Sequence, residues 1–157
     1  MVYPRRFLVL AALMFWQGGF VFYAGVVVPI GTEVLGSARE QGRITRLVAV
    51  WLNWSGAVAL VPLAWDAWTT RGGRLTRRGR LLAWVVMAGC QIVLFALYPR
   101  LDALFDPEAM RLTDRIAFRA GHRTYLWVST AQWAAGVMFA ALTVVAWRES
   151  DASAKRR

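Results

Sequence analysis

Four long runs of uncharged residues constrain this chain more than any other feature of its sequence. They cover residues 7–30, 47–65, 81–98 and 125–147. Soluble proteins disperse apolar residues with a period of about 2 or 3.6, whereas unbroken apolar stretches of about 18 residues or more are typical of membrane spans. A helix satisfies its own backbone hydrogen bonds in lipid, and the alternation of barrel strands is absent. The sequence therefore predicts an all-α, membrane-embedded four-helix bundle.

The composition favours one membrane domain over a soluble one. Of the 157 residues, 58% are hydrophobic and 18% are charged, which leaves too little polar surface for a water-facing fold. We interpret residues 1–157 as a single transmembrane domain in which 148–157 form a charged cytoplasmic tail. A secretory signal peptide is the alternative for the first run, but that run is too long and no small-residue cleavage site follows it.

The distribution of cations predicts the orientation. Four spans place both termini and the middle loop on one side, which carries 11 of the arginines and lysines against 8 on the other. The positive-inside rule then places both termini in the cytoplasm. We expect a multi-pass protein of the bacterial inner membrane, since 18 arginines against one lysine suggest a GC-rich bacterial genome. Tryptophans gather at the predicted span ends, where indoles favour the headgroup level. They are Trp65, Trp68, Trp84 and Trp147 at one end, and Trp51 and Trp127 at the other.

Five arginines crowd the short middle loop. They are Arg71, Arg74, Arg77, Arg78 and Arg80. A net charge of +10 is compatible with nucleic-acid binding, but arginines between two membrane spans are explained more simply by topology and by anionic headgroups. We expect the lipid bilayer and anionic lipid headgroups as partners of these arginines, and no nucleic acid.

Each predicted span contains one carboxamide. They are Gln17, Asn53, Gln91 and Gln132, and Ser129 shares a helical stripe with the last of them. Polar side chains are costly in hydrocarbon unless they find partners, so we expect these five residues to form an inward polar layer. The layer is either structural, holding closely packed helices together, or functional, lining a path for a small neutral solute.

The loop at residues 100–123 is the longest, and its start is predicted from Pro99, which a helix does not easily accommodate. Its apolar residues alternate with charges at roughly helical spacing. We expect a short amphipathic helix on the outer surface, with a flexible loop as the alternative.

Residues that carry chemistry are sparse. His122 is the only histidine, and there is no CxxC motif and no carboxylate cluster. One chain therefore cannot assemble an ordinary zinc or two-histidine haem site, and we predict no metal, no cofactor and no catalytic residue. We expect His122 to have an interfacial role, or to complete a site with another chain. The predicted spans carry no charged residue, which disfavours proton relays and ion-coupled transport by this chain alone.

The segment WQGGFVFYAGVVVPIGTEVLGSAREQGRITR resembles the opening of the transmembrane-protein-205-like family of small four-helix membrane proteins. The resemblance rests on glycines and aromatics in the first helix, a proline at its outer end and a histidine that opens the last helix. The residues are Gly18, Gly19, Phe20, Phe22, Pro29, His122 and Ser129. The resemblance implies a four-helix fold and no reaction.

These patterns favour a non-enzymatic structural or accessory membrane protein that associates with other membrane subunits or with itself. Two alternatives stay open. One is a small transporter or pore that uses the amide layer. The other is a haem- or quinone-associated subunit of a respiratory complex, with His122 as a contributor.

Overall fold

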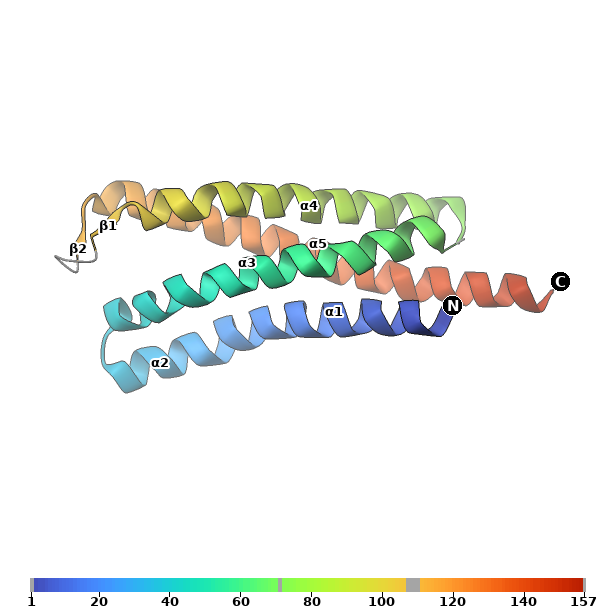
Figure 1. Cartoon of the computed structure of the whole chain (residues 1–157), viewed down its shortest axis with the longest axis horizontal. Helices are drawn as coiled ribbons and strands as arrows, with labels where there is room; N and C mark the ends of the chain where they lie inside the picture. Colours follow the sequence, from blue (N-terminus) through green and yellow to red (C-terminus); the bar gives the residue numbers. More distant parts are fainter. Residues whose placement is uncertain (1, 71, 107–110, 157) are drawn as a thin grey trace.

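The computed structural model is a bundle of four long helical segments. They lie along one axis (Figure 1). It describes residues 2–70, 72–106 and 111–156. The first segment joins α1 (Val2–Phe22), a π-helical turn (Tyr23–Val27) and α2 (Val28–Leu35), and it is followed by α3 (Ala38–Thr69), α4 (Arg74–Asp102) and α5 (Arg115–Lys155). All four segments are long and apolar enough to cross a membrane. The predicted all-α bundle is confirmed.

The two ends of the bundle differ. Both chain termini and the connection between α3 and α4 lie at one end, which we call the terminal end (Figure 1). The turn between α2 and α3 and the connection between α4 and α5 lie at the other, which we call the loop end. The helices extend well past the predicted apolar runs, and residues 148–155, expected as a tail, continue α5.

The π-helical turn lies directly before Pro29, within the first segment. Proline has no N–H to donate, and its ring crowds the carbonyl group four residues earlier, which here belongs to Gly25. A wider π turn separates that carbonyl from the ring, so the first segment crosses the bundle without ending.

The prediction that the third helix stops at Pro99 is wrong. α4 continues to Asp102, and the N–H of Ala103 donates to the Pro99 carbonyl at 3.0 Å. Arg46 of α3 forms an ion pair with Asp102. This contact between helices holds the additional turn in place.

The predicted amphipathic surface helix at residues 100–123 is also wrong. A short antiparallel pair, β1 (Phe105–Asp106) with β2 (Arg111–Leu112), connects the helices, and α5 begins at Arg115. The Asp114 side chain caps α5 by accepting from the N–H groups of Ile116 and Ala117, each at 2.9 Å. The apolar spacing therefore belongs to the first turns of a long helix. Residues 107–110 of this loop lie outside the described residues.

The helices pack as two pairs, α1 on α3 and α4 on α5, joined by contacts between α3 and α4. Contacts between α1 and α5 are sparse. The core is apolar and includes Val9, Trp16, Leu63, Met87 and Phe139. Many large apolar side chains point outward instead, as expected for a bundle that lipid covers. Among them are Phe7, Met14, Phe15, Trp51 and Trp127.

Candidate functional site

A fully buried carboxylate, that of Asp66 near the end of α3, is the centre of a buried polar region. Its Oδ2 forms an ion pair with Nη2 of Arg80, which is also fully buried. Its Oδ1 lies 2.8 Å from Nε of Arg5 on α1, whose N–H is not aligned for a hydrogen bond. One aspartate therefore faces two arginines from two other helices.

Uncharged donors complete the coordination of this carboxylate. The Thr70 hydroxyl donates to Oδ1 at 2.9 Å, and the Trp147 indole N–H donates to Oδ2 at 3.1 Å. Arg80 Nε donates to the Thr143 hydroxyl at 3.2 Å. We call this set of six residues the ionic cluster. It consists of Arg5, Asp66, Thr70, Arg80, Thr143 and Trp147, and all four helical segments contribute to it.

Two further contacts flank the ionic cluster at the terminal end. Arg6 forms a bidentate pair with Asp151 of α5 at 2.6 and 2.9 Å, and its guanidinium lies 5.2 Å from the centre of the Trp147 ring. Glu149 of α5 accepts from the Gly73 N–H at 2.7 Å and from the Thr76 hydroxyl at 3.3 Å. Glu149 thus caps the first turn of α4 with a negative charge, which the helix dipole favours.

The burial of these charges explains why they are paired. Moving a carboxylate or a guanidinium out of water costs several kcal/mol per ion, which close pairing and hydrogen bonding offset. Arg80 is also placed 5.4 Å from the centre of the Phe139 ring, a favourable position for a cation. Its Nη1 is buried and has no hydrogen-bond partner among the described residues. Loss of the Asp66 charge would therefore leave the Arg80 guanidinium buried and unpaired.

The expected role in headgroup contact or topology fits only part of the middle loop. Arg74, Arg77 and Arg78 are exposed, as that role requires. Arg80 is fully buried, so the expected headgroup contact is wrong for that residue, and its expected role in topology stays a prediction. The reason is tertiary: Asp66, fourteen residues earlier, lies across the α3–α4 hairpin and holds the guanidinium inside. Arg71 lies outside the described residues.

The predicted polar layer points inward but divides into separate contacts. Gln132 Nε2 donates to Gln91 Oε1 at 2.9 Å and to the Met87 carbonyl at 3.2 Å, which joins α5 to α4. At another level, the Tyr125 hydroxyl donates to Asn53 Oδ1 at 3.0 Å, which joins α5 to α3. Within the described residues no hydrogen bond joins these two groups, so the amides do not form a continuous ring.

Close packing surrounds these amides. A Cβ at Gly56 would lie 2.6 Å from Gln91 Oε1 and 2.8 Å from Trp16 Nε1, and one at Gly136 would lie 2.2 Å from Gln17 Nε2. The cavity beside the amides has a volume of about 10 Å³. It is lined by Trp16, Gln17, Phe20, Ser129, Gln132 and Trp133. A space of this size holds about one water molecule at most.

His122 lies apart from both groups, in the first turns of α5 near the loop end. It is exposed, and its ring stacks on Phe118 at a centroid distance of 5.7 Å and an interplanar angle of 14°. Within the described ranges, no group of three or more histidine, cysteine or carboxylate side chains is placed to hold a metal ion.

Sequence reasoning missed the ionic cluster because its charges lie just outside the apolar runs. Asp66 directly follows the second run and Arg80 directly precedes the third, so each reads as a span boundary. One signal was available. Ser129, Gln132, Gly136 and Thr143 form a helical stripe, and all four are buried, so the stripe leads along α5 to the cluster. Comparisons with known protein families, curated proteins and solved structures found no match to this chain.

Proposed function

We propose that this protein is a non-enzymatic structural or accessory component of a membrane, with the ionic cluster fastening its four helices at the terminal end. The observation that carries the proposal is the small volume of the cavity beside the amides, about 10 Å³, which is too small for a solute path through the amide region. The buried charges are occupied with one another, and the polar groups of the apolar core mostly bond to neighbouring helices.

We further propose the bacterial inner membrane as its location, with both termini in the cytoplasm. Support comes from the excess of cations on the side that carries the termini, of which Arg74, Arg77 and Arg78 are exposed. We also propose that the chain belongs to the transmembrane-protein-205-like family. The proposal is based on the residues that resemble that family, and the four-helix architecture is compatible with it.

Purification from the native membrane in mild detergent tests the proposal. We expect a colourless preparation with other membrane subunits or a second copy of the chain attached, and no turnover or solute flux after reconstitution into liposomes. Activity of the purified chain would contradict a structural role. A haem absorption spectrum or bound quinone would favour the respiratory-subunit alternative, in which His122 contributes from the surface.

A small transporter is the second candidate, and one observation favours it. Gln17 Oε1 and Gln91 Nε2 are buried and lack hydrogen-bond partners among the described residues. Buried unpaired polar atoms carry a cost of about 1–3 kcal/mol each and often mark a site that a ligand or water completes.

Replacing each amide by leucine separates the two candidates. A transporter predicts that Gln17→Leu or Gln91→Leu abolishes flux while the protein stays folded. The structural proposal predicts no flux in the native protein, and a loss of stability in Gln132→Leu, whose amide makes two buried hydrogen bonds.

A further inference from the structure

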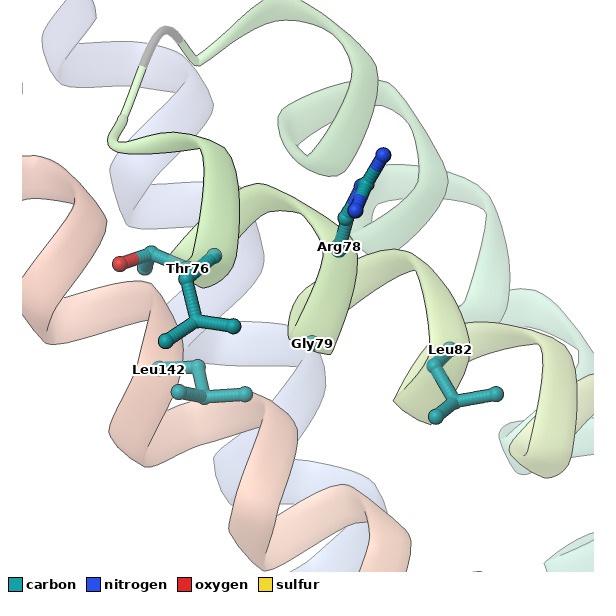
Figure 2. Close-up of a pocket in the computed structure, with 6 residues that line it drawn as sticks. Thr76, Arg78, Gly79, Leu82 and Leu142 are labelled. Atoms are coloured by element: carbon teal, nitrogen blue, oxygen red, sulfur yellow. The ribbon is translucent and has the colours of Figure 1, made fainter.

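A partly open apolar groove lies between α4 and α5 near the terminal end (Figure 2). Its volume is about 380 Å³. It is lined by Leu75, Thr76, Arg78, Gly79, Leu82 and Leu142. The groove is far larger than the cavity beside the amides.

Gly79 creates the groove. A Cβ at this position would lie 2.9 Å from Leu142 Cδ1, so the absence of a side chain lets α5 approach α4 and leaves a hollow beside the contact. Leu75 and Leu82 stand one turn on either side of Gly79 along α4, and both are largely exposed. Figure 2 shows Gly79 between Thr76 and Leu82, with Leu142 opposite. The floor is therefore apolar over about two helical turns.

The exposed charges on the α4 side of the groove are positive, and Glu149 on the α5 side is bonded to Gly73 and Thr76. Arg78 lines it, and Arg74 and Arg77 are exposed on the same first turns of α4. In Figure 2 the Arg78 side chain extends from α4 away from Leu142, so its guanidinium lies clear of the apolar floor. Within the described part of the chain, Arg78 forms no ion pair and no side-chain hydrogen bond with another residue. Arg78 is therefore a cation without a counter-ion in the described chain, and it lies next to an apolar groove.

The tryptophans place the groove at the depth where lipid headgroups begin. Trp84 lies five residues beyond Gly79 on α4, and Trp147 lies five residues beyond Leu142 on α5. Indoles collect at the boundary between hydrocarbon and headgroups, and a long arginine side chain can reach from that depth to the headgroup layer. At this boundary the headgroup of an anionic phospholipid joins its acyl chains, so one lipid could contact both the arginine and the apolar groove.

We propose that this groove binds one anionic phospholipid, with an acyl chain along Leu75, Gly79, Leu82 and Leu142 and the phosphate paired with Arg78. The charge of the neighbouring arginines selects an anionic lipid over a zwitterionic one. The inference rests on the membrane location in the proposed function and is independent of whether the protein is structural or a transporter.

Native mass spectrometry of the detergent-solubilised protein, titrated with phosphatidylglycerol or phosphatidylcholine, tests the proposal. We expect one phosphatidylglycerol per chain to bind most tightly. Arg78→Gln removes charge-assisted hydrogen bonds and should weaken this binding about tenfold. Arg77→Gln is the matched control, because Arg77 is exposed on the same turn but does not line the groove, and it should change binding less than about twofold.

A second pair of variants tests the apolar part of the site. Leu142→Trp fills the groove and should also weaken phosphatidylglycerol binding about tenfold, whereas Ile92→Trp, at an exposed position elsewhere on α4, should not. Equal effects of Arg78→Gln and Arg77→Gln, or equal binding of the two lipids, would overturn the site and leave only general attraction to a basic surface. Turnover or flux by a protein that keeps its bound lipid would contradict the proposed function and would leave the lipid site unaffected.

Discussion

At the scale of single residues, Asp66 is a buried charge on which contacts from several helices converge. It is fully buried and contacts Arg5, Arg80, Thr70 and Trp147, which belong to the other helical segments or to the chain just after α3. Together with the Arg6–Asp151 pair between α1 and α5, contacts through this carboxylate link the two helix pairs at the terminal end.

We predict that Asp66→Asn destabilises the protein by about 3–5 kcal/mol, because the change leaves the Arg80 guanidinium buried without a counter-charge. Denaturant unfolding in detergent micelles, followed by circular dichroism, measures the loss. Asp102→Asn is the control at the other ion pair between helices. Its partner Arg46 is partly exposed, so the expected cost is about 1 kcal/mol or less.

The double variant Asp66→Leu with Arg80→Leu distinguishes a charge effect from general damage to packing. Replacing a whole buried pair by apolar residues is often close to neutral, so this variant should be more stable than Asp66→Asn alone. An equal or larger loss would show that the helices depend on the shape of this region rather than on its charge balance.

Gly56 provides a second residue-scale prediction, in the amide region. Gly56→Ala should destabilise the bundle by about 1–3 kcal/mol, because the new methyl group would overlap Trp16 and Gln91. Gly89→Ala is the matched control, since nothing lies within 4 Å of a Cβ there. Alanine has the higher helix propensity, so this control should be neutral or slightly stabilising. Equal effects in the two thermal unfolding curves would contradict the close packing of α3 on Trp16.

At the scale of elements, Glu149 joins two helices by capping α4 from α5. Glu149→Gln should reduce the stability of the first turn of α4 by about 1 kcal/mol, which corresponds to about fivefold faster amide hydrogen exchange at Gly73. Exchange measured by NMR in micelles reports this locally. Unchanged exchange at Gly73 would mean that another group holds that N–H.

Element boundaries were the least predictable part of the fold, because contacts between helices decide where each helix ends. α4 passes through Pro99 where Arg46 pairs with Asp102, and α5 begins ten residues before its apolar run because Asp114 caps it. Local sequence indicates that a proline weakens a helix, but it does not reveal a stabilising partner from another segment.

At the scale of the whole molecule, the arrangement predicts that both termini share one side of the membrane. In a Cys90→Ala background, Ala154→Cys should react with a membrane-impermeant maleimide only when cytoplasmic access is provided, and Arg39→Cys only from the opposite side. The reverse pattern would overturn the proposed orientation but keep the fold. Labelling of both positions from one side would contradict a four-span bundle.

The sequence alone determined the number of spans, the helical class, the inward stripe of α5 and the inward direction of the amides. These follow from local hydropathy and helical periodicity, which each segment carries by itself. Only the tertiary structure decided that Arg80 lies inside while Arg78 lies outside, and that the amides pair as Gln91 with Gln132 and Asn53 with Tyr125. The physical reason is that burial of a charge depends on a counter-charge from a different helix, and the position of Asp66 relative to Arg80 exists only once the hairpin has folded.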